Sequence, residues 1–277
     1  MLPIRRDLHF SIDPARVCDW HGRGRIVTHF MNALSLFFPD GERFFIHSVR
    51  YYRERLADPE LRDAVTAFIG QEAMHGREHT AYNGAMAAAG LPAEPLQRRV
   101  AALLEQLKVI LPAPTQLGIT IALEHLTAIM ANALLAHPDL IEGSDPNYSA
   151  LWRWHALEET EHKAVAFDVY ERTVGTGATA YAVRASSLVV ASTIFAALVF
   201  AYHLRLVAAD PKARKVRDGL RMVGFLYGRK GLLRRIAGPW LDYFRPGFHP
   251  WQHDNRALLD EIDAFTARIE REMLTAA

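Results

Sequence analysis

Two short stretches of the chain place histidine and glutamate at helical spacing, and they constrain the fold more than any other feature. In the first, Glu72 is followed by His75; in the second, Glu159 lies between His155 and His162. Residues three or four positions apart lie on the same face of an α-helix. Each stretch therefore predicts a stripe of imidazole and carboxylate groups, a donor set that suits iron, manganese or zinc better than calcium.

Two Glu-x-x-His elements on separate helices are typical of a centre with two metal ions inside a helical bundle, which takes one further glutamate from each of two other helices. Glu42 and Glu124 are placed to supply these carboxylates. Glu124 and His125 are the only ionisable residues in the apolar stretch 115–136, so we expect Glu124 in the core. Glu42 falls in the first turn of a predicted helix, where the helix dipole also favours a carboxylate. The alternatives are a single zinc ion or a chance cluster of surface charge.

The choice between Glu158 and Glu159 as a metal ligand is close, because both lie within one turn of His162. Glu159 is preferred, since it gives the same Glu-x-x-His spacing as Glu72 and His75. Glu158 would then either support the site from outside or be spare, and Glu161 should face away.

Capping and proline signals divide the chain into helices. A helix over 25–38 should stop at Pro39, with Asp40 capping the next helix to about residue 56. Asp58 and Asp145, each followed by proline, should cap two more. Helices are thus expected at 25–38, 40–56, 58–90, 94–111, 115–136, 145–175, 185–204 and 255–274.

The four candidate glutamates fall into two pairs. Glu42 and Glu72 are 30 residues apart, Glu124 and Glu159 are 35 apart, and a long crossover separates the pairs. This spacing predicts an all-α fold, a ferritin-like four-helix bundle with additional C-terminal helices. We expect one all-helical domain, in which residues 22–175 form the metal-binding bundle and hydrophobic and basic helices of residues 176–277 pack on it.

Composition narrows the class of protein further. The net charge of +1 argues against a nucleic-acid-coating protein. A single cysteine, Cys18, argues against disulfides and thiolate metal sites and fits a reducing cytoplasm. The N-terminal residues lack the apolar run of a secretory signal, and the sequence shows no Gly-rich phosphate loop or nucleotide fingerprint.

The C-terminal part contains a stretch that is apolar enough to contact or span a membrane. Residues 185–204 contain no Asp, Glu, Lys or Arg and are long enough to span a bilayer. Serine and threonine dilute this run, which favours a packed helix over a peripheral membrane contact or a true span. The basic segment 212–235 carries nine Lys or Arg residues, and we expect it on the surface, at the inner membrane face or beside a reductase or carrier protein.

Several motifs resemble those of the bacterial proteins grouped as "predicted metal-dependent hydrolases". The resemblance covers nearly the whole chain and is carried by the segments 38–45, 68–75, 155–163 and 245–251. It implies a ferritin-like fold, and some members look like non-haem di-iron monooxygenases. The set His155, Glu159 and His162 is also similar to that of the arylamine N-oxygenases, which implies that His155 is a seventh ligand. His79 has no counterpart in the ferritin-like pattern.

These features favour a cytoplasmic di-iron oxygenase that uses O2 to hydroxylate a small apolar substrate. Two iron ions, or manganese or zinc, would be held by Glu42, Glu72, His75, Glu124, His155, Glu159 and His162. Electrons would come from a separate reductase, no nucleic acid is expected as a partner, and a homodimer is compatible with this reading. The alternative is a dinuclear hydrolase acting on an ester or phosphate, and a third class is iron storage or a membrane-tethered binding protein.

Overall fold

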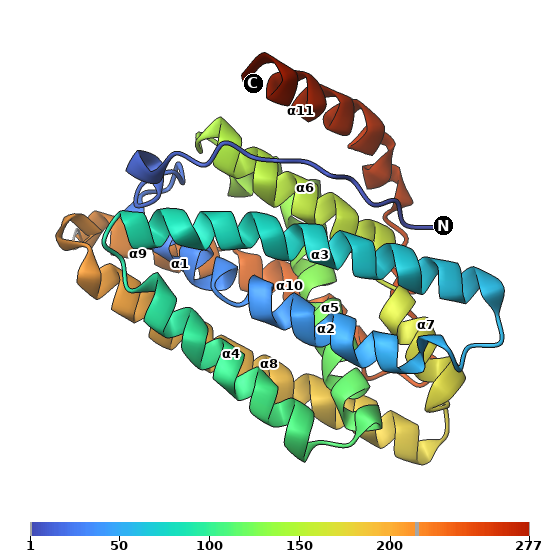
Figure 1. Ribbon diagram of the computed structural model, residues 1–277. Coiled ribbons are helices and arrows are strands. Elements are labelled where there is room, and N and C mark those ends of the chain that lie inside the picture. Colours follow the sequence, from blue (N-terminus) through green and yellow to red (C-terminus); the bar gives the residue numbers. More distant parts are fainter. Residues whose placement is uncertain (1, 214–215, 277) are drawn as a thin grey trace.

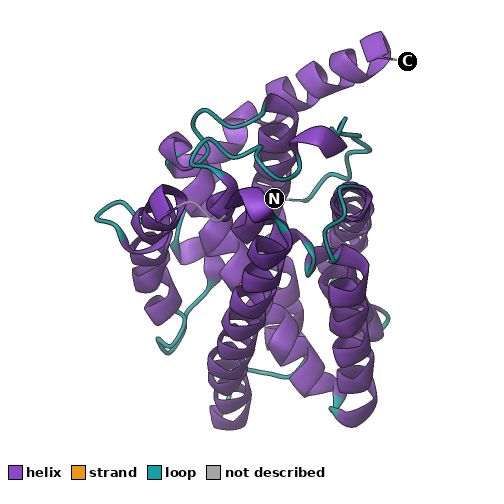
Figure 2. Cartoon of the chain, turned by 90° about the vertical axis from the view of Figure 1, so that its left-hand side faces the viewer, coloured by secondary structure: helices purple, strands orange, loops and turns teal. Residues whose placement is uncertain are grey.

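The computed structural model describes residues 2–213 and 216–276, and within them the chain forms helices and loops without strands (Figures 1 and 2). The predicted all-α class is confirmed. The α-helices are α1 (Arg25–Ser35), α2 (Phe38–Arg53), α3 (Pro59–Ala88), α4 (Ala93–Ile110), α5 (Ala113–Ala136), α6 (Pro146–His162), α7 (Val165–Thr173), α8 (Ala178–Ala209), α9 (Val216–Tyr227), α10 (Leu232–Asp242) and α11 (Ile262–Ala276).

Four of these helices, α2, α3, α5 and α6, form the central bundle (Figure 1). Helix α2 packs against α3, and α5 packs against α6, so the chain makes two helical pairs. Helix α4 is the connection between the pairs and lies against α2 and α3. The arrangement is compatible with the ferritin-like bundle expected from the spacing of the glutamates.

Helices α3 and α5 carry apolar residues on both sides of a short polar stretch. On α3, Phe68 belongs to one buried apolar cluster and Tyr82 to another, and the polar residues lie between them. On α5, Ile121 and Ile129 belong to the same two clusters on either side of Glu124. The bundle therefore encloses a polar layer between two apolar layers.

Helix capping follows the sequence signals at two of the three predicted positions. The Asp58 side chain accepts from the backbone N–H groups of residues 60 and 61, and Asp145 from those of residues 147 and 148. The prediction at Pro39 is wrong, because α2 already begins at Phe38 and Pro39 lies in its first turn. Proline is tolerated there, since the first N–H groups of a helix have no partner within the helix. Asp40 is consequently not a cap and pairs with Arg43 instead.

The helix expected over 145–175 is interrupted directly after His162, where a turn at residues 163–164 separates α6 from α7. The Lys163 ammonium donates to the backbone carbonyl of His253 at 2.7 Å and to Asn255 Oδ1 at 2.6 Å. The interruption therefore coincides with a contact to the C-terminal loop rather than with a proline or glycine.

The remaining helices cover the bundle. Helix α8 packs along α5 and α1, while α9 contacts α1 and α10 contacts α5. Helices α5 and α8 are both long and apolar enough to cross a bilayer by length and composition. Helix α8 is packed on one side, as preferred from the sequence, but its other side exposes Val190, Ile194 and Phe200.

The N-terminal segment runs over α3 and α6 (Figure 1). Leu8 from this segment packs with Trp154 of α6 and Phe265 of α11 in a third apolar cluster. The N-terminal segment is thus held between the bundle and the last helix.

Candidate metal centre

The polar layer of the bundle brings together all seven residues singled out in the sequence. Their side chains are between 0% and 3% exposed, and they come from all four bundle helices: Glu42 from α2, Glu72 and His75 from α3, Glu124 from α5, and His155, Glu159 and His162 from α6. They form three overlapping groups in which the donor atoms lie within 4.8 Å of one another. The groups share His75 and Glu72, so the layer is continuous.

The shortest distances in the layer centre on Glu159. Its Oε1 lies 3.0 Å from His155 Nε2, 3.6 Å from His162 Nε2 and 3.9 Å from His75 Nδ1. His162 Nε2 also lies 3.2 Å from Glu72 Oε1. Glu159 Oε1 thus lies near three imidazole nitrogens, and it is close to donor atoms in both halves of the layer.

Nine side-chain atoms in this layer are buried without a hydrogen-bond partner among the described residues. They are both carboxylate oxygens of Glu42, Glu72 and Glu124, Oε2 of Glu159, Nδ1 of His75 and Nε2 of His162. An unpaired buried carboxylate costs several kcal/mol, and a bound cation removes that cost. The donor set and its convergence therefore fit transition-metal ions with nitrogen and oxygen ligands.

His75 is oriented from behind by Glu158. The His75 Nε2–H donates to Glu158 Oε2 at 3.1 Å, which turns Nδ1 toward Glu72 and Glu159. Glu158 in turn accepts from the Arg6 guanidinium at 3.3 Å. In this structure Glu158 therefore supports a histidine from outside, as the preferred sequence reading proposed.

His162 has an equivalent support. Its Nδ1–H donates to Gln71 Oε1 at 2.9 Å, which leaves Nε2 as the nitrogen facing the carboxylates. The Gln71 amide nitrogen donates to Glu161 Oε2 at 2.6 Å, and Arg6 binds both oxygens of Glu161 at 2.9 and 3.1 Å. The hydrogen bonds of Arg6 and Gln71 thus help to fix the orientation of two site histidines, His75 and His162.

A chain of hydrogen bonds supports His155, and it gives His79 a structural role as one of its members. Ser35 Oγ–H donates to Asn83 Oδ1 at 2.8 Å, so Ser35 accepts from His79 Nδ1–H at 2.9 Å. His79 Nε2 then accepts from His155 Nδ1–H at 2.8 Å. The remaining His155 nitrogen, Nε2, carries a lone pair and faces Glu159. Two lone pairs 3.0 Å apart repel unless a cation or a proton lies between them.

The electrostatics of the layer follow from its burial. Burial raises the pKa of Glu42, Glu72 and Glu124, and neighbouring carboxylates raise it further. Burial also acts to raise the pKa of Glu159, but the neighbouring imidazoles of His155 and His162 outweigh it and lower the pKa overall. Without a bound cation, several of these carboxyl groups therefore hold protons.

Burial also shifts the pKa of Glu158, which supports the site, and of His75, which belongs to it. It raises the pKa of Glu158 to about 8, although the charge of Arg6 and its hydrogen bond act in the opposite direction. It lowers the pKa of His75, so that imidazole is neutral and able to donate its lone pair.

Sequence reasoning missed the supporting residues. Arg6 lies in a segment without periodicity, and nothing in the sequence marks it as a partner of α6. Gln71 adjoins Glu72, which was the only available signal. Glu78 is also buried and accepts from the Phe10 N–H at 3.0 Å. Glu161 does face away from the carboxylate layer, but it is buried against Arg6.

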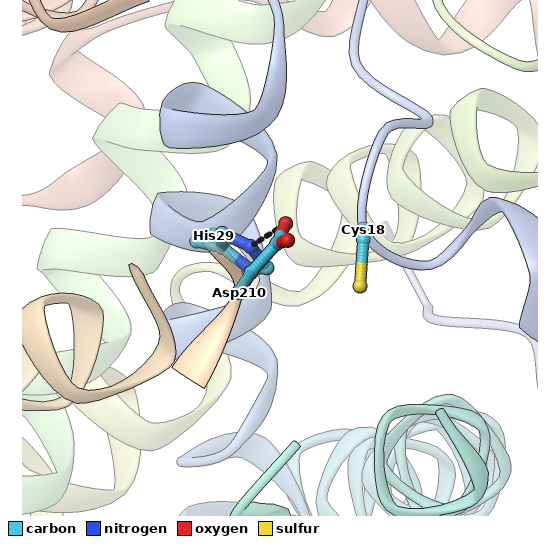
Figure 3. Close-up of side chains that lie close together, drawn as sticks. All are labelled: Cys18, His29 and Asp210. Carbon is cyan, nitrogen blue, oxygen red and sulfur yellow. Dashed lines mark hydrogen bonds and ion pairs between the residues drawn. The ribbon is translucent and has the colours of Figure 1, made fainter. Parts of the chain in front are cut away.

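A second group of donor side chains lies outside the bundle centre and contains Cys18, His29 and Asp210 (Figure 3). His29 Nε2 and Asp210 Oδ2 are 3.0 Å apart. The same Asp210 oxygen accepts from the Arg25 guanidinium at 2.8 Å. Because an arginine already neutralises this carboxylate, the group is best described as an ionic contact between α1 and the end of α8.

The sequence comparisons agree with a metal-binding role. A sequence model for a family described as "predicted metal-dependent hydrolase" matches residues 4–254. The chain belongs to this family. The matched region includes all seven residues of the layer together with Arg6, Gln71 and His79. No curated protein and no solved structure matches the chain.

Proposed function

We propose that this protein is an enzyme with a dinuclear metal centre. The observation that carries the proposal is the convergence of nine unpaired buried donor atoms in one layer. The proposed ligands are Glu42, Glu72, His75, Glu124, His155, Glu159 and His162. Seven nitrogen and oxygen ligands exceed what one transition-metal ion normally accepts, and the ions would be two irons, or manganese or zinc.

The leading reaction is oxidation of an apolar substrate by O2. Two apolar cavities adjoin the layer: one of about 60 Å³ is lined by His155 and Glu159, and another of about 350 Å³ is lined by Glu42. Apolar walls favour O2 and an apolar substrate over a charged one. Two bound irons would supply the redox chemistry, with electrons delivered by a separate reductase.

The protein side chains have defined tasks in this proposal. Glu158, Gln71 and His79 hold His75, His162 and His155 in single tautomers, so that one lone pair of each faces the layer. The apolar layers on both sides exclude water, which strengthens every charge interaction inside.

Hydrolysis is the second candidate, and the family description favours it, whereas no comparison names oxidation. Two metal ions lower the pKa of a bound water, and one of the buried carboxylates would accept its proton. The substrate would then be an ester or phosphate that reaches the layer through one of the cavities.

Metal content and redox dependence test these proposals. Elemental analysis should find about two transition-metal ions per chain, whereas one zinc per chain, unchanged after reconstitution with iron, would contradict the dinuclear centre. Iron-loaded, anaerobically reduced protein mixed with O2 should change its absorption spectrum. Ester or phosphate cleavage by the zinc-loaded protein without O2 would replace oxidation with hydrolysis.

A further inference from the structure

The larger apolar cavity is a groove between α4, α5 and α8 that ends at the start of α2. Its volume is about 350 Å³, which lies within the ~300–1,000 Å³ typical of small-molecule sites. Leu103, Leu107, Ile119, Leu123, Ala191 and Ile194 form much of the wall. Among the described residues that line it, Glu42 is the only ionisable one.

The inner end of the groove adjoins the metal centre. Glu42 belongs both to the groove wall and to the carboxylate layer. Phe38 and Thr127 line the groove and also the small cavity that contains His155 and Glu159. The Phe38 ring packs on the rings of His155 and His79, with centroids 4.4 and 4.5 Å apart. A molecule lying in the groove would thus reach the centre at Glu42.

The outer end opens at an unusually apolar surface. Helices α4 and α8, which border the groove, lie on the same side of the bundle (Figure 1). Val190 and Ile194 of α8 line the groove and are still 56% and 49% exposed. No Asp, Glu, Lys or Arg occurs in residues 185–204. A contiguous exposed apolar surface of this kind marks an interaction or ligand site more often than a plain solvent face.

We propose that this groove binds the hydrocarbon chain of a lipid-like substrate, with the methyl end toward Glu42 and the polar head at the mouth between α4 and α8. The inference rests on the proposed function, because it names the substrate class of that centre. An unbranched chain fits an apolar channel that has no charged wall before Glu42. The charged head stays outside, since the groove walls before Glu42 carry no charged partner for it and burying an unpaired charge is costly. The enzyme therefore acts on the chain far from its head group.

Binding of a fluorescent fatty acid to the metal-free full chain tests occupancy of the groove. The probe is 11-(dansylamino)undecanoic acid, displaced by palmitic acid. Ala191→Phe fills the groove and should weaken probe binding at least about tenfold, which corresponds to about 1.4 kcal/mol. The control Ala196→Phe adds the same ring at an exposed position of the same helix and should change binding by less than about twofold, within about 0.4 kcal/mol. Equal binding by all three proteins, or none, would overturn the proposal.

Two further measurements keep the test decisive. Far-UV circular dichroism checks that Ala191→Phe is folded, and Leu107→Trp fills the groove from α4 should that variant fail. Metal content is measured in parallel. Groove-dependent probe binding by a chain that takes up no metal on reconstitution would refute the dinuclear centre alone. A chain that takes up two metal ions but shows no groove-dependent binding would refute the groove alone.

Photolabelling tests the orientation of the chain. Palmitic acid with a diazirine on its terminal carbon should label the peptide that contains residues 38–45. The same acid with the diazirine beside the carboxylate should label residues 103–111 or 186–194. The reverse pattern would overturn the methyl-first orientation. Phosphatidylcholine vesicles with a diazirine on the acyl chain, compared with the free acid, assign the source of the chain to a membrane or to solution.

Discussion

Loading the metal centre should release protons, and the structure indicates which groups lose them. Burial and neighbouring carboxylates raise the pKa of Glu42, Glu72 and Glu124, so these groups keep their protons to a higher pH than ordinary carboxyl groups when no cation is bound. A carboxyl group must lose its proton to bind a metal ion. Glu159 has a lowered pKa and is already ionised, and His75 is already neutral. Metal binding should therefore release up to about three protons.

The sign of the pH dependence follows directly. Each released proton makes the metal affinity rise about tenfold per pH unit, which is about 1.4 kcal/mol. Over the pH range in which two to three of these groups are protonated, the affinity should thus rise about 10²- to 10³-fold per pH unit. The metal-free protein should behave in the opposite way. A carboxyl whose folded-state pKa is raised contributes stability below its ordinary pKa, and this contribution is lost as the pH rises through the raised value.

Calorimetric titration with Mn²⁺ in two buffers of different ionisation enthalpy measures the proton release. Glu124→Gln should release about one proton fewer than the wild type. Glu78→Gln is a matched control, since Glu78 is equally buried but bonds to Arg77 and the N-terminal segment. If the heat of Mn²⁺ binding is the same in both buffers, no protons are released. The carboxyl groups would then already be ionised, and the electrostatic argument would be wrong.

Three other perturbations separate the roles of individual groups. Glu124→Ala should empty the centre, whereas Glu158→Ala should weaken metal binding only about 10- to 100-fold, because it removes the support of a ligand; the reverse order in metal content after dialysis would exchange their roles. His155→Ala should retain much of the metal but lose the O2-dependent absorption change, and metal loss as complete as in His162→Ala would make it an ordinary ligand. Co-sedimentation with anionic vesicles should be salt-sensitive and should fall, by about 1 kcal/mol per charge near the surface, when four basic residues are changed to glutamine; negligible sedimentation of both proteins would leave the basic segment as a solvated face. These four are Arg229, Lys230, Arg234 and Arg235.

The basic segment itself is only partly accessible. Arg229, Lys230 and Arg234 are exposed, whereas Phe225 and Ile236 are buried against the remaining helices. Arg214 and Lys215, which belong to the same segment, lie outside the described residues. Leu220, Val223 and Tyr227 of the same segment are also exposed, so its surface carries apolar as well as basic side chains.

The site was predictable because its residues violate the pattern around them. Glu124 interrupts an apolar helix, and Glu72 with His75 continues an apolar stripe with polar groups, so the helical repeat alone places them inward. Asp58 and Asp145 were predictable as caps because capping depends on residues two or three positions away.

The residues that support the site were not predictable from such local rules. Arg6 reaches Glu158 and Glu161 only because the N-terminal segment crosses α6, and a segment without periodicity does not reveal its path. The role of His79 depends on its hydrogen bond to Ser35 of α1, which joins two separate helices. The turn after His162 likewise depends on Lys163 and the distant C-terminal loop.

The contact between the N-terminal segment and α6 joins parts of the chain that are far apart in the sequence. Arg6 and the backbone of Ile4 both bind Glu161, and the Ile4 carbonyl accepts from Gln71 at 3.0 Å. These bonds to Glu161 span 155 and 157 positions, so they form only after α3 and α6 have both been synthesised. The seven proposed ligands likewise come from four helices. The proposed centre would therefore bind metal tightly only in a chain whose bundle is complete.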